Sequence, residues 1–169
     1  MSKYYLIFGG IAGISSAILE YLLFSGKLGF DKMGGVLFGK VLGLIICIVF
    51  AVILIKKLNN GISFMRTSFS GLMIALICSA VSGIGYSYMY YPDGAFFNDA
   101  KEYTFEYWKE ANKDDPKELA RAEEQREDIE RTYSLRYHTI LDLGTFMTIG
   151  LVFTAFLAGI VGDRRSLAG

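Results

Sequence analysis

Four long apolar runs set the pattern of this chain, with short polar segments between the first three and a longer one before the fourth. They lie at about residues 4–26, 33–55, 67–91 and 139–162, and neither proline of the chain, Pro92 or Pro116, falls inside one. Each run is long enough to cross a hydrocarbon core of about 30 Å at about 1.5 Å per residue. Because a bilayer offers no water to backbone amides, such runs must be helical. The pattern therefore predicts an all-α integral membrane protein with four transmembrane helices in a single domain, residues 1–169.

The segment between the third and fourth runs, residues 92–138, is polar and predicts a helical insertion. Asp99 is placed to cap a first short helix, whose apolar stripe follows at helical spacing. That stripe consists of Tyr103, Tyr107, Trp108 and Ala111. It could pack against the next helix, which we favour, or lie on the membrane surface or on a partner. Asp115 and Pro116 begin a second helix, and no later proline or glycine pair stops it from continuing unbroken into the fourth run.

The insertion differs from the rest of the chain in net charge. Residues 92–138 carry eight Lys or Arg and thirteen Asp or Glu, a net charge of −5, while the rest of the chain carries +5. The cations Lys3, Lys56, Lys57, Arg66, Arg164 and Arg165 flank the run ends on one side, against Lys27, Lys32 and Arg136 on the other. The positive-inside rule then predicts that both termini are cytoplasmic and that residues 92–138 are extracytoplasmic.

Small residues recur at every fourth position within the runs and predict close helix packing. The positions that we expect to matter most are Gly35, Gly39, Gly43, Gly71 and Gly83. One small-residue ridge left on the outside of the bundle would serve a second copy or another subunit.

Charged residues inside the runs predict a polar cluster. Glu20 and Lys40 each lie about 10 Å below the outer ends of adjacent antiparallel helices, so we expect an ion pair, because an unpaired charge at that depth is costly. His138 and Asp142 begin the fourth run at the same level. Three tyrosines, Tyr21, Tyr86 and Tyr88, could complete the cluster. The cluster could be a structural clasp, which we favour, or a proton- or cation-binding site that opens outward.

Signals of an enzyme are sparse. The chain has one histidine and lacks HExxH, GxSxG and a GxGxxG placed after a strand, so we expect no catalytic residue, no cofactor and no nucleic-acid partner. His138 and Asp142 offer only two ligands, so we expect no metal. Cys47 and Cys78 fall mid-helix and are interpreted as packing residues. The hydroxyls of Ser15, Ser16, Ser68, Ser70, Thr145 and Thr148 are expected to bond their own helix backbone.

Several segments together resemble a known family. They are the short basic N-terminus, the turn KKLNNGISFMRTSFSG at 56–71, the YYP exit at 90–92, the charged outer segment and the DRR that follows the fourth run. In these features the chain is similar to the bacterial membrane family called domain of unknown function 4199. The resemblance implies a small multi-pass protein of the bacterial inner membrane, and supplies no reaction, ligand or catalytic residue.

Two functions are compatible with these patterns. The first is a non-enzymatic accessory, assembly or interaction subunit, surrounded by lipid, that contacts a second copy or a larger membrane complex through residues 99–136 or a small-residue ridge. The alternative is a small oligomeric transporter or channel that uses Glu20, Lys40 and Asp142.

Overall fold

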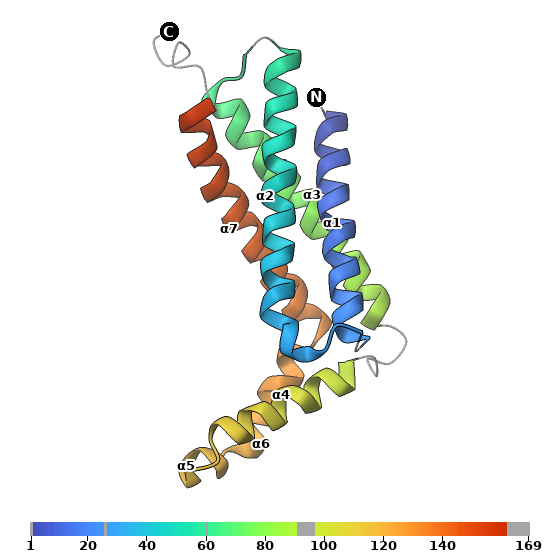
Figure 1. Cartoon of the computed structure of the whole chain (residues 1–169), viewed down its shortest axis with the longest axis vertical. Coiled ribbons are helices and arrows are strands. Elements are labelled where there is room, and N and C mark those ends of the chain that lie inside the picture. The colour runs from blue at the N-terminus through green and yellow to red at the C-terminus, as the bar shows by residue number, and fades with distance from the viewer. Residues whose placement is uncertain (1, 26, 60, 91–96, 162–169) are drawn as a thin grey trace.

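The computed structural model describes residues 2–25, 27–59, 61–90 and 97–161, and the regular elements in these ranges are all helices (Figure 1). Four are long: α1 (Ser2–Phe24), α2 (Met33–Leu58), α3 (Phe64–Tyr90) and α7 (Leu135–Val161). The others are a short 3-10 turn, η1 (Phe30–Lys32), and three helices between α3 and α7, namely α4 (Asn98–Ala111), α5 (Pro116–Leu119) and α6 (Ala122–Thr132).

The four long helices confirm the four predicted apolar runs. By length and composition each can cross a membrane, with mean hydropathies from 1.8 to 2.9. Their bounds differ from the predicted ones by a few residues. The second helix continues through Lys56 and Lys57, and the fourth begins at Leu135 rather than at 139. The reason is that helix formation does not stop where hydrophobicity stops, since lysine and arginine are good helix formers.

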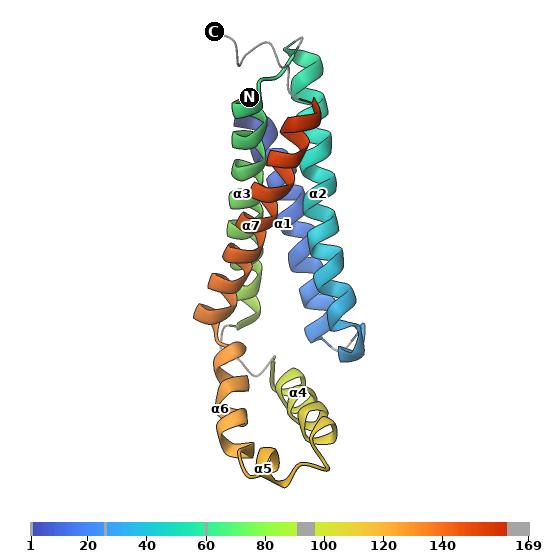
Figure 2. The same cartoon turned by 90° about the vertical axis from the view of Figure 1, so that its left-hand side faces the viewer.

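The long helices form a bundle in which α3 is central, with extensive contacts to α1 and to α7, while α2 packs mainly on α1. The start of α1, the α2–α3 connection and the end of α7 lie at one end of the bundle, and α4, α5 and α6 lie beyond the other end (Figures 1 and 2).

The tightest glycine contact joins α3 to α7: a Cβ built on Gly71 would stand 1.7 Å from Thr154 Cγ2. Gly71 thus lets these two backbones approach.

The other predicted packing glycines differ from Gly71. A Cβ on Gly39 would lie 3.3 Å from Leu19 Cδ1, and one on Gly83 would lie 3.7 Å from Thr139 Cγ2. Gly35 and Gly43 face open space, so the prediction that they pack within this bundle needs correction. The buried face of α2 follows Val36, Lys40, Leu44 and Ile48, and each open glycine precedes one of these by a single residue, which is about 100° around the helix. Both glycines therefore lie off the buried face of α2.

The insertion forms a helical pair. α4 and α6 run side by side, joined by α5 (Figure 2). Their buried face contains Ala100, Phe105, Ile129 and Tyr133, and the ion pairs Lys101–Glu130 (2.6 Å) and Arg126–Glu102 (3.3 Å) flank it. The predicted stripe on α4 is confirmed for Trp108, which packs against this face, and wrong for Tyr107. Tyr107 is 69% exposed, because it is two residues from Phe105 and therefore on the other side of the helix.

The caps of these helices were predicted in part. Asp115 caps α5 as expected, accepting bonds from the backbone amides of Lys117 (2.9 Å) and Glu118 (3.3 Å), with Pro116 at the first helical position. Asp99 does not cap α4: the capping position is Phe97, which supplies no side-chain bond. The helix therefore begins before the residue chosen from sequence.

A continuous helix from residue 117 into the fourth run was also expected to be possible, and the structure shows breaks instead. α5 ends at Leu119, α6 ends at Thr132 and α7 begins at Leu135. At the second break Ser134 Oγ accepts from the Tyr137 amide at 3.3 Å and donates to the Arg131 carbonyl at 2.6 Å. A serine that caps a new helix in this way separates α6 from α7 without a proline or glycine.

Candidate functional site

Three ionisable residues from three helices meet inside the bundle. Lys40 Nζ on α2 donates to Glu20 Oε1 on α1 and lies 2.9 Å from both carboxylate oxygens of Asp142 on α7. The side chains of Glu20, Lys40 and Asp142 are 3%, 4% and 9% exposed. Lys40 and Asp142 each stand seven residues inside their helices, a depth of about 10 Å. Two buried carboxylates thus share one ammonium.

His138 extends this arrangement, and we call Glu20, Lys40, His138 and Asp142 the ionic cluster. His138 Nε2 lies 3.0 Å from Glu20 Oε1 and 3.8 Å from Asp142 Oδ2. The ring of Tyr86, on α3, stacks on the imidazole with centroids 3.7 Å apart. The five residues predicted for the cluster, Tyr86 included, therefore come together.

Two of the tyrosines considered from sequence lie elsewhere. Tyr21 and Tyr88 are exposed on the flank of the bundle, and the Lys27 ammonium lies over the Tyr21 ring. Their position is typical of tyrosines near a membrane surface, and they are not members of the ionic cluster.

Two serines that were not predicted as part of the cluster add hydrogen bonds to it. Ser82 Oγ on α3 donates to Asp142 Oδ2 at 3.2 Å, and Ser16 Oγ on α1 lies 3.0 Å from Ser82 Oγ. Ser16 was expected to bond its own helix backbone, and the structure gives it a partner on another helix. A sequence signal existed: Ser16 precedes Glu20, and Ser82 precedes Tyr86, by one helical turn. The four long helices thus all contribute polar atoms at this level.

An aromatic layer separates the ionic cluster from α4 and α6. Phe97 stacks on Tyr86 with centroids 4.8 Å apart, and Phe24 meets Phe97 edge to face at 4.8 Å. The Tyr86 hydroxyl donates to the Tyr133 carbonyl at 3.1 Å, and the Tyr133 hydroxyl pairs with Thr104 Oγ1 at 2.9 Å. Burial raises the pKa of the Tyr133 phenol, so this group stays neutral. We call Phe24, Tyr86, Phe97 and Tyr133 the aromatic layer. It connects the cluster directly to the helical pair.

Three residues of the ionic cluster also have the side chains of a possible metal site. Glu20, His138 and Asp142 can each offer one ligand atom, with these atoms within 4.8 Å of one another. However, the Lys40 ammonium contacts both carboxylates and would stand directly beside any metal ion that they bound, where the two positive charges would repel. We therefore assign these residues no metal.

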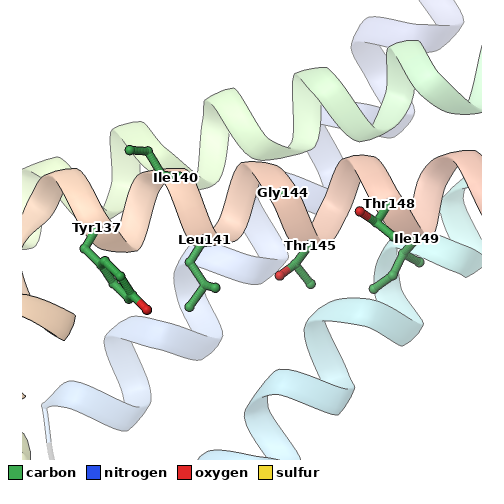
Figure 3. Close-up of a pocket in the computed structure, with 7 residues that line it drawn as sticks. All are labelled: Tyr137, Ile140, Leu141, Gly144, Thr145, Thr148 and Ile149. Atoms are coloured by element: carbon green, nitrogen blue, oxygen red, sulfur yellow. The ribbon is translucent and has the colours of Figure 1, made fainter.

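A groove of about 580 Å³ runs along α7, away from the ionic cluster. Seven residues line it, and Figure 3 shows Tyr137, Leu141, Thr145 and Ile149 projecting from one side of the helix. The lining is mostly apolar and contains no member of the ionic cluster. Its character suits contact with lipid chains better than recognition of a polar ligand.

Comparison with known proteins gives a family and no activity. Neither the curated proteins nor the solved structures contain a match to this chain. The sequence model of one family, described as "Protein of unknown function (DUF4199)", matches residues 6–162, nearly the whole chain. This match confirms the resemblance seen in the sequence: the chain belongs to the DUF4199 family.

Proposed function

We propose that this chain is a non-enzymatic membrane protein that acts by contacting other proteins, as an accessory or assembly subunit. The observation that carries the proposal is the position of α4, α5 and α6. They lie beyond the end of the bundle (Figures 1 and 2), yet the aromatic layer and the bond from Tyr86 to Tyr133 hold them firmly to it. A helical pair held in this way suits recognition by another protein.

The outer surface of the helical pair supports the same proposal. Tyr107 is exposed on α4, and residues 92–138 carry a net charge of −5. Tyrosine is enriched in protein interfaces, and an acidic surface favours a partner with a basic one. Among the described residues of the pair, the ion pairs Lys101–Glu130 and Arg126–Glu102 hold the two helices together, while Tyr107 faces away from Phe105 and the core.

A photoreactive phenylalanine analogue placed at Tyr107 should cross-link to one protein of defined mass in cells. The matched control places the same analogue at Phe105, which is buried against α6 and should give only products within the chain. Analysis of the adducts by mass spectrometry identifies the partner, and an adduct of twice the chain mass identifies a second copy. Equal adducts at both positions, or none at Tyr107, would contradict the proposal.

We further propose that the protein lies in the bacterial cytoplasmic membrane with both termini in the cytoplasm. The support is that the end of the bundle holding the start of α1 and the α2–α3 connection carries Lys3, Lys56, Lys57 and Arg66. The helical pair would then stand on the extracytoplasmic side.

Cysteine labelling tests this orientation. In a chain with Cys47→Ala and Cys78→Ala, we expect Asp115→Cys to react with a membrane-impermeant maleimide in intact cells. Asn59→Cys, exposed at the end of α2, should react only after lysis. The reverse pattern would overturn the orientation.

The alternative remains a small oligomeric transporter or channel. The buried ionisable groups favour it, whereas the placement of Lys40 between both carboxylates and the position of the cluster near one end of the bundle weigh against it. Proton- or cation-dependent flux in proteoliposomes that Glu20→Gln abolishes would favour this alternative.

A further inference from the structure

The ionic cluster is not electrically balanced by its permanent charges. Glu20 and Asp142 ionised, with Lys40 protonated, leave one net negative charge, and His138 is the remaining ionisable member. A net charge buried at this depth is costly. One additional proton makes the cluster neutral.

The position for that proton is given by the geometry of His138 and Glu20. His138 Nε2 is 3.0 Å from Glu20 Oε1, a distance at which an N–H on this nitrogen donates to the carboxylate. The imidazole is 17% exposed, more than the other three members of the cluster, so it is the member nearest the surface of the bundle. Imidazole is also the side-chain group that ordinarily changes charge between about pH 5 and 8.

A second observation shows that the cluster is incomplete without another hydrogen. Glu20 Oε2 is buried and has no hydrogen-bond partner among the described residues. A buried carboxylate oxygen without a donor is unfavourable. The carboxyl group of Glu20 therefore offers a second position to which the same proton could move.

We propose that the ionic cluster is a binding site for one exchangeable proton, held by the His138–Glu20 pair and exchanged through His138, the most exposed member of the cluster. The proton comes from solvent and returns to it, with no other reactant. This inference does not rest on the proposed interaction role, because it concerns only groups inside the bundle and would hold for a transporter as well.

Other charged and titratable groups surround the pair. They are Lys40 on α2, Asp142 on α7, and Tyr86 and Cys78 on α3, which lie near enough to Glu20 and Asp142 to interact with their charges. Phenols and thiols as classes lose their protons above the range of imidazole. Lys40 contacts both carboxylates, but His138 Nε2 lies 3.0 Å from Glu20 and 3.8 Å from Asp142, so the exchangeable proton is assigned to His138 and Glu20.

Proton binding would affect Tyr86, which contacts the helical pair. An imidazolium stacked on Tyr86 gains a cation–π attraction that a neutral ring lacks. Tyr86 in turn holds the Tyr133 carbonyl and packs on Phe97. The proton therefore strengthens the contact that holds Tyr86, the residue through which the cluster reaches the helical pair.

Because the chain has one histidine, the site can be observed directly. We would label the full chain with [15N]histidine, place it in lipid nanodiscs and record both imidazole nitrogens between about pH 4.5 and 9.5. The expected result is one reversible titration. In Glu20→Gln, the cluster should bind the proton about tenfold more weakly, because the neighbouring negative charge is gone.

A control variant and the results that would overturn the proposal complete this test. Glu102→Gln, an exposed carboxylate on α4, should leave the titration unchanged. A ring that keeps one form over the whole range, or a titration that Glu20→Gln does not move, would overturn the proposal. If Glu20→Gln does not assemble, Glu20→Asp retains the charge but withdraws it from the imidazole, and should shift the titration in the same direction by a smaller amount. An unmoved midpoint in that variant would overturn the proposal as well.

Discussion

Lys40→Met should lower the free energy of unfolding by about 3–5 kcal/mol, the largest effect that we expect from a single substitution in this chain. Lys40 is the shared partner of Glu20 and Asp142, and its removal leaves two carboxylates facing each other in a buried site. The apolar length of methionine fills much of the same space, so the loss reports charge rather than a cavity. Reversible unfolding in mixed micelles, followed by circular dichroism, measures the change.

Two comparisons separate this effect from a general loss of lysine. Lys113→Met removes an exposed lysine paired with Glu110, and should change stability by less than about 1 kcal/mol. The triple variant Glu20→Gln, Lys40→Met and Asp142→Asn removes all three charges together and should recover most of the loss, because no unpaired charge remains buried. A Lys40→Met chain as stable as Lys113→Met would mean that the ionic cluster does not hold the bundle.

Gly71→Ala should destabilise the contact between α3 and α7 by about 1–3 kcal/mol. The added methyl would stand 1.7 Å from Thr154 Cγ2 and 2.7 Å from Thr154 Cβ, so one of the helices must shift. The same unfolding measurement in mixed micelles gives the size of the effect.

Gly43→Ala is the matched control, because it makes the same change in a long helix at a position that faces open space. It should be neutral or slightly stabilising, since alanine is the better helix former. Thr154→Gly removes the side chain that Gly71→Ala would strike, so the double variant should lose less than the two single variants together. If the two single losses simply add, Gly71 and Thr154 do not contact each other, which would contradict this packing.

The features that the sequence predicted are those that depend on length along a helix. Counting at about 1.5 Å per residue put Glu20 and Lys40 at one depth, and the rigid rise of a helix makes such counting reliable. Hydrophobic length similarly predicted the four long helices. Neither argument depends on how a helix is rotated about its axis.

The features that sequence missed depend on that rotation and on neighbours. Gly35 and Gly43 look equivalent to Gly39 and Gly71 in spacing, and only the position of α1 and α3 around α2 turns them outward. Similarly, spacing could not show that α4 buries Phe105 and exposes Tyr107. The break at Ser134 needed a serine to act as a cap rather than as an exposed helical residue.

The sequence placed Asp142 in the cluster, but only the structure shows that Lys40 contacts Asp142 as well as Glu20. An isolated pair would permit exchange of the two charges, Glu20→Lys with Lys40→Glu, without loss. In the structure the exchanged carboxylate would face Asp142 and the exchanged ammonium would face His138. Because Asp142 on α7 also contacts Lys40, exchanging the two charges should not restore the stability that either single variant loses.

The central claim is that α2 and α7, whose sequence positions are 102 residues apart at this contact, are joined by Lys40 and Asp142 in the ionic cluster. A double-mutant cycle with Lys40→Met and Asp142→Asn measures this link most directly. Our account predicts that the double variant is more stable than the sum of the single losses allows, by about 2 kcal/mol or more. Losses that simply add would show that the two side chains do not interact, and would contradict the site described above.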